Sequence, residues 1–371
     1  MVKKFLVPPG FQDSLSFDAF VEHQYKNSII NSFRDNGFSL VKTPLIESRG
    51  NFDKNTLEIK SNTKKEILSI RNDITPQIIR IVSSRLAKKT RPLKLCYYGE
   101  VVRRKGSILR PERQFQQVGA EIIGSESYKA DVEIINLAYE TLKNIGVKNI
   151  VIEISAPFFL DSLLNKINDS KLKIKLKKLI EFKDLNSCLK ILKDEDIIKS
   201  LRALYSCVGP IKNKKKQIAK VSEFIGFSEE VTRLLKISNL IKVSKNDSIN
   251  IDLFEIHKNK KYYHGIKFTF FAKGVRGEIA GGGRYNIKYE KNLETAIGYT
   301  CYMDTVLRAS SFDNKIKKIL IPFNTDEKTK NFLIKKGFTI FKIFENNIDM
   351  KTQSKKFGIK YFLINKKVKR L

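Results

Sequence analysis

Residues 97–124, YYGEVVRRKGSILRPERQFQQVGAEIIG, contain two strand-like runs on either side of a polar loop that carries Gly and Pro. Together with the LKLC just before them, they predict an antiparallel hairpin with strands over residues 93–103 and 113–124. The connection over 104–112 is a long, polar loop. The segment therefore favours a mainly antiparallel sheet, and the rest of the chain is interpreted around this hairpin.

One face of the predicted hairpin gathers polar side chains. Gly99 and Gly119 fall on this face and carry no side chain, so a small ligand can lie against the backbone among the polar groups. Glu121 stands in an apolar strand, where a buried carboxylate needs a partner because its desolvation is costly. If Arg103 lies opposite Arg113, alternation along the strands gives this face four polar residues: Arg103, Arg113, Gln117 and Glu121.

The residues before the hairpin predict a helix, a strand and a second helix. Residues 38–47 are interpreted as a strand that ends near Pro44, and residues 65–89 as a strand, a turn and a helix. Thr75 is the predicted N-cap of that helix and Pro76 its first helical residue. The first helix, over 18–36, ends before Gly37 and has apolar residues at helical spacing: Phe20, Val21, Tyr25, Ile29 and Phe33.

The rest of the chain predicts alternating helices and strands. Residues 1–156 and 246–312 are interpreted as one core, interrupted by a helical insertion over 157–245, and residues 316–371 as a small α/β segment. The expected elements are a helix over 126–145, strands over 147–155, 249–256 and 262–272, a glycine-dense turn over 277–286, and a strand followed by a helix over 295–309.

The net charge is the most prominent feature of the composition. The 71 Lys+Arg minus 39 Asp+Glu give +32. This charge fits either a nucleic-acid footprint or the codon bias of an AT-rich genome, since 55 of the 71 cations are Lys and they are dispersed. The planar guanidinium of Arg can bind a carboxylate or a phosphate through two hydrogen bonds, which the ammonium of Lys cannot do. The eight Arg between residues 71 and 113 therefore indicate a site: Arg71, Arg80, Arg85, Arg91, Arg103, Arg104, Arg110 and Arg113.

Targeting and metal signals are weak. The N-terminus, MVKKFLVPPGFQD, lacks the apolar region of a secretory signal, and no apolar run is long enough to span a membrane, so a cytoplasmic location is expected. Four scattered cysteines without CxxC spacing and three histidines predict reduced thiols and no metal site. No cofactor is expected.

Several motifs allow two interpretations. The GGGR at 281–284 fits a phosphate loop poorly, because no Lys-Ser/Thr follows, and better fits a tight turn that lets two backbones approach. The pair Tyr262 and Tyr263 fits either a strand core or hydroxyl contacts to a ligand. Asp73 is interpreted in one of two ways. It is either a structural carboxylate, paired with a nearby cation or with the helix N-terminus, or a ligand-binding group.

In this order, PPGFQD, KTPLIE, IRNDITPQIIR, the hairpin, YYHGIKF, GGGRYN and AIGYT resemble the core of histidyl-tRNA synthetases over residues 5–310. The motif RNDITPQIIR is more similar to the corresponding segment of the regulatory subunits of ATP phosphoribosyltransferase, which are paralogues of those synthetases. The resemblance implies an α+β, class II aminoacyl-tRNA synthetase-like fold: a mixed, mainly antiparallel six-stranded sheet flanked by helices, which dimerises through its first motif.

The resemblance also implies a histidine site. Asp73, Thr75 and Gln117 fall where the family holds the ammonium group, and Arg103 falls near the carboxylate end. Histidine needs an anion for its ammonium group, a cation for its carboxylate and hydrogen-bond acceptors for its ring N–H, and the residues implied by the resemblance supply each of these. The complete set of residues implied for histidine binding is Asp73, Thr75, Arg103, Gln117, Glu121, Lys258, Tyr262 and Tyr263, of which Glu121 and Tyr263 take the imidazole positions.

Departures from the synthetase pattern predict that adenylate chemistry is lost. Thr305, Lys105 and Lys258 stand where the synthetases keep an ATP-binding Arg, an acid and a second Arg. The sequence therefore predicts a non-catalytic regulatory subunit with histidine as effector. Its expected partner is a short-form ATP phosphoribosyltransferase catalytic subunit, in a hetero-oligomer built on a homodimer, without nucleic acid. A divergent histidyl-tRNA synthetase is the alternative.

Overall fold

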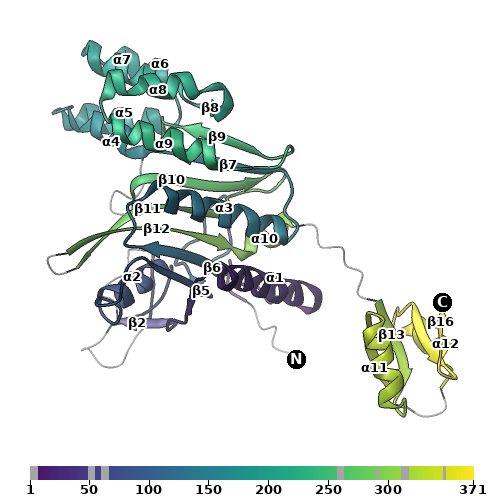
Figure 1. Ribbon diagram of the computed structural model, residues 1–371. Coiled ribbons are helices and arrows are strands. Elements are labelled where there is room, and N and C mark those ends of the chain that lie inside the picture. The colour runs from purple at the N-terminus through teal and green to yellow at the C-terminus, as the bar shows by residue number, and fades with distance from the viewer. Residues whose placement is uncertain are drawn as a thin grey trace. The chain divides into compact units, whose positions relative to one another are not determined.

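The computed structural model describes residues 7–48, 55–59, 67–256, 263–289, 292–310, 317–345 and 348–371. The chain forms two compact units, Met1–Ser311 and Phe312–Leu371. The larger unit is built around one long sheet with helices on both faces (Figure 1). The smaller unit has a sheet of its own and is described separately below.

The long sheet has nine strands in the described residues, more than the six expected. Antiparallel pairs dominate, and the parallel pairs are β1 with β5 and β7 with β9. The mixed, mainly antiparallel class is confirmed, but the strand number was wrong because β1 and the pair β9 and β8 extend the sheet at its two edges. Their order is β1 (Ser39–Val41), β5 (Leu93–Val102), β6 (Gln114–Ile123), β12 (Asn292–Tyr302), β11 (Ala280–Tyr289), β10 (Tyr263–Ala272), β7 (Ile150–Ser155), β9 (Ser248–Asp252) and β8 (Gly209–Pro210).

The hairpin of β5 and β6 has the register that the sequence interpretation assumed. Val102 pairs with Gln114, Gly99 pairs with Gln117, and the Arg103 N–H donates to the Arg113 carbonyl at 2.7 Å. The polar face inferred from alternation is therefore confirmed. Cross-strand pairing carries the same face onto β12, where Gly298 lies opposite Glu121.

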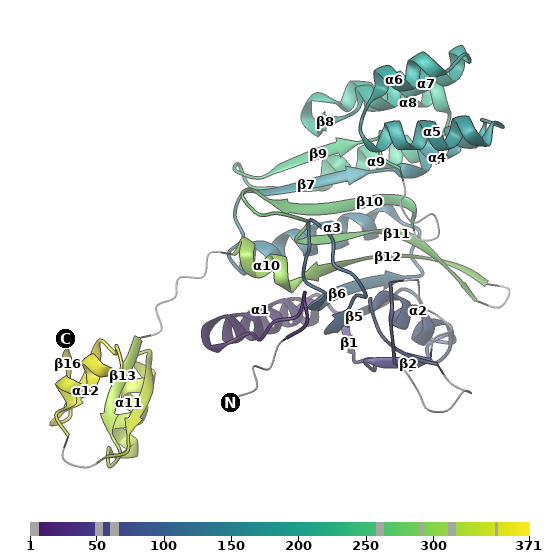
Figure 2. The ribbon, with the colours of Figure 1, turned by 180° about the vertical axis from the view of Figure 1, so that it is seen from behind.

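Helices cover both faces of this sheet (Figure 1, Figure 2). One apolar core joins the sheet to α1 (Ser16–Asp35), α3 (Tyr128–Asn144) and α10 (Met303–Ala309). A second core, which includes Tyr97 and Tyr285, joins the opposite face to α2 (Thr75–Ser83). A small antiparallel sheet comprises β2 (Ile46–Ser48), β4 (Leu68–Ile70) and β3 (Leu57–Ile59).

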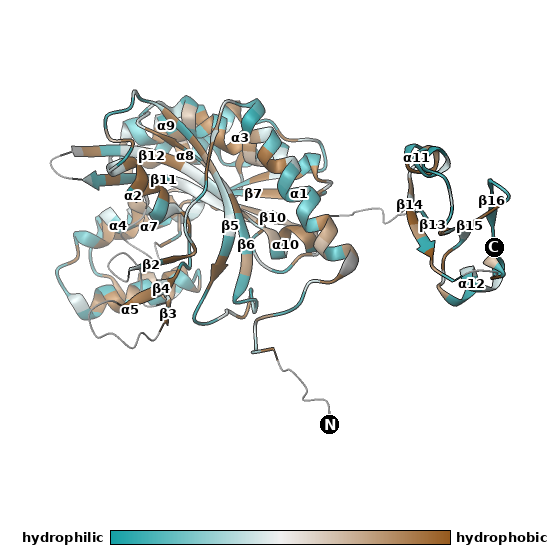
Figure 3. Ribbon diagram, turned by 90° about the horizontal axis from the view of Figure 1, so that it is seen from below, coloured by the Kyte–Doolittle hydropathy of each residue, from teal (hydrophilic) through white to brown (hydrophobic). Residues whose placement is uncertain are grey.

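The first helix forms where the apolar spacing predicts it. Val21, Tyr25, Ile29 and Phe33 are buried at intervals of four residues. The chain leaves the helix at Gly37, whose φ of +80° favours glycine. Phe20 was predicted on the buried side but is 59% exposed, because it lies one position off the buried row. The apolar character of the strands and the mixed faces of the helices are visible in Figure 3.

The glycines at 281–283 lie in a strand, so the predicted turn was wrong. They belong to β11, between β10 and β12. Gly282 lies in a close approach of two backbones, since a Cβ there would come within 2.1 Å of the Gly298 carbonyl oxygen. The close approach was predicted correctly, but it occurs across a ladder of paired strands rather than at a turn.

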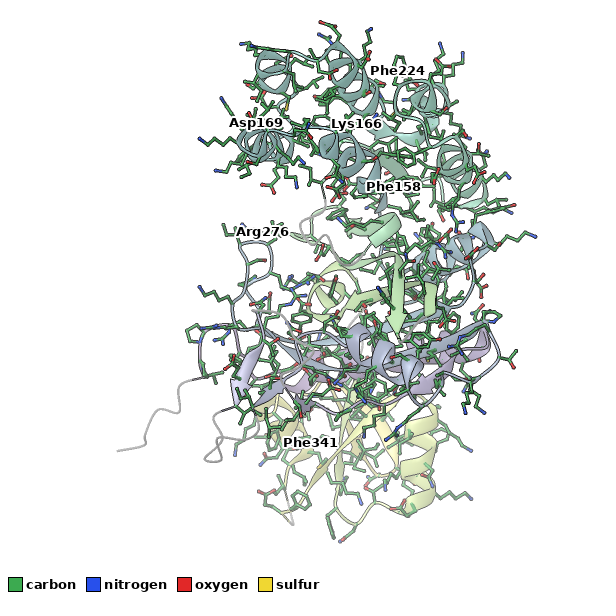
Figure 4. All side chains as sticks on the ribbon, turned by 90° about the vertical axis from the view of Figure 1, so that its left-hand side faces the viewer. Phe158, Lys166, Asp169, Phe224, Arg276 and Phe341 are labelled. Atoms are coloured by element: carbon green, nitrogen blue, oxygen red, sulfur yellow. The ribbon has the colours of Figure 1, made fainter. Side chains whose placement is uncertain are left out.

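The segment between β7 and β9 is mainly helical. Asp169, Asp184 and Asp194 each cap a helix by accepting hydrogen bonds from its first backbone N–H groups. The Phe158 ring contacts the Phe159 ring at a tilted angle and meets Phe227 edge-on, and Phe158 and Phe224 lie among these helices in Figure 4. The helices are α4 (Pro157–Asn165), α5 (Ser170–Glu181), α6 (Leu185–Ile191), α7 (Glu195–Ser206), α8 (Lys215–Ile225) and α9 (Ser228–Leu240).

The smaller unit is an α/β fold with its own core. Its strand order is β14-β13-β15-β16; β13 is parallel to β14 and β15, and β16 is antiparallel to β15. Two clusters of buried apolar residues, one including Leu320 and the other Ile319, lie on opposite faces of this sheet. The elements are β13 (Lys317–Pro322), α11 (Glu327–Lys335), β14 (Phe338–Ile343), α12 (Met350–Lys356), β15 (Tyr361–Ile364) and β16 (Lys367–Arg370).

Candidate functional site

Glu121 is the centre of a buried polar cluster on the glycine-bearing face of the sheet. Its side chain is 1% exposed. The hydroxyl groups of Thr75 and Tyr97 donate to Oε1 at 3.1 and 3.4 Å, and the Tyr285 hydroxyl donates to Oε2 at 3.0 Å. The Tyr97 hydroxyl also shares a hydrogen bond of 2.7 Å with that of Thr300. Hydroxyl groups, rather than a cation, thus surround this carboxyl.

The environment of Glu121 favours its protonated form. Burial raises the pKa of Glu121 to about 8, and the hydrogen bonds from Tyr285, Thr75 and Tyr97 only partly offset this rise. A carboxylate has about four acceptor positions, and three donors are found among the described residues. Oε2 receives one of them, so Oε2 has an acceptor position for a ligand N–H once Glu121 is ionised.

Glycine at position 298 makes room for this carboxyl. A Cβ at Gly298 would lie 1.6 Å from Glu121 Oε2, so any larger residue would displace the carboxyl group. Gly119 has a similar role, since a Cβ there would lie 2.5 Å from the Tyr97 hydroxyl oxygen. The space over these two glycines is therefore occupied by polar groups of the protein, and these groups lie directly on the backbone of the sheet.

Asp73 and Gln117 form the second part of the site. The Ile74 N–H donates to Asp73 Oδ1 at 3.0 Å and to Gln117 Oε1 at 3.1 Å. Burial raises the pKa of Asp73, while hydrogen bonding to Gln117 and the nearby charge of Arg103 lower it. Asp73 and Gln117 thus present two acceptor groups side by side at the start of α2, an arrangement suited to an ammonium group.

Thr75 does not cap α2, so that prediction was wrong by one residue. The N-cap is Ile74, Thr75 is the first helical residue, and Pro76 follows it in the first turn. The Thr75 hydroxyl donates to Glu121 and hydrogen-bonds Tyr97, because the sheet behind the helix offers it buried partners. The residue thereby connects the helix start to the carboxyl cluster.

Arg103 lies beside these groups without joining their hydrogen bonds. Its guanidinium is 4.9 Å above the Phe115 ring, and its charge acts on the pKa of Asp73. The structure therefore brings together five of the predicted site residues: Asp73, Thr75, Arg103, Gln117 and Glu121. Lys258 and Tyr262 lie outside the described residues, and Tyr263 is described only by its backbone, which begins β10 opposite Tyr285.

Three residues of the cluster were missed by the sequence reasoning: Tyr97, Tyr285 and Thr300. Tyr97 could have been found, because it alternates with Gly99 on the polar face of the hairpin. Tyr285 and Thr300 could not, because their place depends on β11 and β12 pairing with β6, far along the chain. No local pattern marks such a contact.

Of the eight arginines between residues 71 and 113, some make structural contacts within the protein and others are exposed. Arg71 is buried and donates to five acceptors, on Thr43, Pro44, Gln77 and Glu100. A Cβ at Gly99 would collide with its guanidinium, so that glycine serves Arg71 and not a ligand. Three other arginines of this set form ion pairs with acidic side chains: Arg80 with Glu47, Arg91 with Glu294, and Arg110 with Asp304.

Two of the three positions that depart from the synthetase pattern lie in the hairpin loop and in α10. Thr305 is buried and donates to the Tyr302 carbonyl at 3.0 Å, whereas Lys105 is exposed. Arg110 is a cation of the same region: its guanidinium lies 3.9 Å above the Tyr302 ring and pairs with Asp304 at 3.1 Å. This guanidinium is therefore engaged with the protein itself.

The part of the chain that the structure describes contains neither a metal-binding cluster nor a membrane-spanning helix. In the described ranges, no group of three or more His, Cys, Asp and Glu side chains is placed to hold a metal ion. All four cysteines are free, as predicted, and they are also buried. Among the helices of the described residues, none has the length and apolar character that crossing a membrane requires.

The fold and the polar cluster around Glu121 define a class II synthetase-like protein of the histidyl type. The family model for histidyl-tRNA synthetase matches residues 10–306. The crystal structure of an ATP phosphoribosyltransferase regulatory subunit/histidyl-tRNA synthetase from Bacillus halodurans is similar, with a TM-score of 0.79, 19% identity, and coverage of 95% of this chain and 96% of that one. The predicted fold class is thus confirmed.

Within this class, the chain belongs to the family of ATP phosphoribosyltransferase regulatory subunits. The regulatory subunit of Rhodospirillum rubrum is 32% identical over 90% of this chain and 88% of its own length. That of Caldanaerobacter subterraneus subsp. tengcongensis is 30% identical over 93% and 97%, respectively. The family suggested by the sequence motifs is therefore confirmed.

Proposed function

We propose that this protein is the regulatory subunit that assembles with a short-form ATP phosphoribosyltransferase catalytic subunit and confers feedback inhibition by histidine. The observation that carries the proposal is the polar cluster of Asp73, Thr75, Gln117 and Glu121 on a glycine-bearing sheet face, in a chain of this family. The complex of ATP phosphoribosyl transferase from Thermotoga maritima also contains a chain of this fold, with a TM-score of 0.59.

Histidine matches the chemistry of the cluster. Its ammonium group would be held by the acceptor oxygens of Asp73 and Gln117. One ring N–H would be accepted by the spare position on Glu121 Oε2. Arg103 supports a carboxylate nearby, and Lys258, Tyr262 and Tyr263 complete the site in this proposal. The bound effector would act through a coupling free energy between the two subunits, commonly about 1–3 kcal/mol.

The proposal includes the absence of catalytic activity in this chain. Adenylate formation needs cations that stabilise the charge on ATP phosphates. Thr305, Lys105 and Lys258 stand where the resemblance expects two Arg and an acid, and Arg110 is already paired with Asp304. We also propose a homodimer within the hetero-oligomer, a helical subdomain over 157–245 within the core, and a cytoplasmic location.

Co-expression with a short-form catalytic subunit tests the function. We expect a stable complex on size-exclusion chromatography, phosphoribosyltransferase activity that depends on this chain, and inhibition by histidine only in the complex. A catalytic subunit that is fully active and histidine-sensitive without this chain would overturn the proposal. So would the absence of a complex at micromolar concentrations of both chains.

A divergent histidyl-tRNA synthetase is the second candidate, and the match to the synthetase family model favours it. Histidine-dependent exchange of pyrophosphate into ATP separates the two functions. The regulatory proposal predicts no exchange above a blank without protein. Robust exchange that requires histidine would establish the synthetase activity instead.

A further inference from the structure

The fold of the smaller unit separates its charges. Residues 317–371 contain 15 cationic and four acidic side chains. The parallel strands β13, β14 and β15 begin at one edge of their sheet, which we call the amino edge, and end at the opposite, carboxyl edge. The helices between them therefore begin at the carboxyl edge and end at the amino edge. All four acids lie at the carboxyl edge, where they follow a strand or begin a helix: Asp326, Glu327, Glu345 and Asp349.

The amino edge carries nine exposed cations and none of the acids of this unit. These cations lie at the starts of β13 and β15, at the ends of α11 and α12, and at the end of β16, which runs antiparallel to β15. The ion pairs found among the described residues of this unit, Lys330 with Glu327 and Lys366 with Asp326, lie at the opposite edge. We call the nine cations the amino-edge patch: Lys317, Lys318, Lys335, Lys336, Lys355, Lys356, Lys360, Lys369 and Arg370.

Composition and helix dipoles do not account for this patch. Codon bias sets how many Lys residues a chain contains, but not where the fold places them. A helix dipole favours cations at the end of a helix, which accounts for the four Lys that end α11 and α12. The other five lie on or beside strands, where no helix dipole favours them. Like charges gathered at one edge repel each other, so the patch costs the free protein stability and favours a negatively charged ligand.

Aromatic rings lie among these cations. Phe357 follows α12 and is 45% exposed. Phe332, on α11, is 53% exposed, and the Lys336 ammonium lies 4.4 Å from the centre of its ring. The Arg370 guanidinium lies 5.9 Å from the centre of the Tyr361 ring, at the start of β15. Single-stranded nucleic acids bind to surfaces of this composition, because cations contact the phosphates and the bases stack on exposed rings.

We infer that the amino-edge patch binds single-stranded nucleic acid, with its cations on the phosphates and its exposed rings against the bases. The sequence predicted no nucleic-acid partner because the Lys residues are dispersed along the chain, but folding brings nine cations to one edge. The binding is independent of the proposed regulatory function. The smaller unit also lies outside the synthetase family model, which ends at residue 306.

Fluorescence anisotropy of the full chain with labelled oligonucleotides of about 12 nucleotides tests the inference. We expect a Kd of about 1–10 μM at about 50 mM KCl, and similar values for oligouridine RNA and oligothymidine DNA, because neither contact depends on the sugar. If about five phosphates are contacted, the affinity should fall roughly 100-fold by about 200 mM KCl. No binding at the lower salt concentration, or affinity that does not change with salt, would overturn the proposal.

Two matched variants locate the binding on the chain, because each removes three exposed Lys from one edge of the same sheet. The amino-edge variant should lose at least about 10-fold in affinity, and its salt slope should fall by about 2. The carboxyl-edge variant should lose less than about 3-fold. Equal losses would show that the overall charge binds the oligonucleotide and would overturn the patch. The two variants are Lys355→Gln with Lys356→Gln and Lys360→Gln, and Lys328→Gln with Lys351→Gln and Lys367→Gln.

Stacking is tested with Phe357→Leu, which keeps an apolar side chain beside Phe341 and removes the ring. Oligonucleotide affinity should fall about 5-fold, while the affinity for heparin, a polyanion without bases, should stay unchanged. Phe323→Leu is the control, since that ring is 52% exposed at the carboxyl edge and also contacts a second Phe. Equal effects of Phe357→Leu on both polyanions would overturn the role of the rings. Tighter binding to vesicles of phosphatidylcholine and phosphatidylserine than to the oligonucleotide would assign the patch to a membrane surface instead.

Discussion

Replacing Glu121 with Gln should flatten the dependence of stability on pH. Burial raises the pKa of Glu121 from 4.5 to about 8. The folded chain therefore keeps a proton that the unfolded chain releases. This contribution to the free energy of unfolding is fully present below the unfolded pKa of 4.5 and is lost as the pH rises through about 8. The amide of the Glu121→Gln variant does not titrate, so the variant lacks this contribution at every pH.

The magnitude follows from the size of the pKa shift. Each pH unit between the two pKa values changes the free energy of unfolding by about 1.4 kcal/mol. From about pH 5.5 to pH 7, where the unfolded group is ionised and the folded group protonated, the wild type should lose about 2 kcal/mol through this residue. Other titrating groups add their own slopes, but they are common to wild type and variant and cancel in the difference.

Urea unfolding at several pH values across this interval measures the difference. The chain has no Trp, so near-UV circular dichroism of tyrosine is the probe, and the buried Tyr97, Tyr285 and Tyr299 report on the larger unit. Glu140→Gln, at an exposed position of α3, is the control and should keep the wild-type slope. Parallel curves for the wild type and Glu121→Gln would refute the raised pKa and the buried environment that causes it.

Four further changes test the contacts of the site and its scaffold. Glu121→Ala should weaken histidine binding at least about 10-fold in calorimetry and leave the complex with the catalytic subunit intact; unchanged affinity would remove Glu121 from the pocket. Gly298→Ala should cost about 1–3 kcal/mol in urea unfolding through the collision with the carboxyl group, and a neutral result would contradict the packing. Arg71→Met should cost at least about 2 kcal/mol by leaving buried acceptors unpaired, which a wild-type melting temperature would disprove. Asp131→Ala should cost about 3–5 kcal/mol, because it leaves the buried Arg284 guanidinium without its carboxylate; unchanged urea unfolding would argue against that ion pair.

The Asp131 ion pairs show how the helical segment joins the core. Asp131 is fully buried at the start of α3 and pairs with Arg284 of β11 at 2.7 Å. It also pairs with Arg233, on α9 of the segment between β7 and β9. The arginine that ends the GGGR motif is therefore a structural residue, and neither interpretation of that motif from the sequence included this role.

Much of the fold could be read from local patterns. The apolar spacing of α1 and the alternation along β5 and β6 fix which side chains share a surface, and a strand's register follows once one pair is placed. The shared face of Gln117 and Glu121 was therefore predictable from alternation, whereas the pairing of Arg103 with Arg113 was an assumption that the structure confirms. The motifs in their order were enough to indicate the family.

Local sequence patterns were thus sufficient for the hairpin and its polar face, and the resemblance carried by the motifs indicated the family and the residues that the structure gathers around Glu121. Neither could reveal the hydroxyl of Tyr285 beside Glu121, because Tyr285 approaches it from 164 residues away and no local spacing encodes such a contact. The strand at 281–283 likewise emerged from long-range strand pairing. Glycine occurs both in turns and in strands, and only the neighbouring strands determine which group of the protein occupies the space above it.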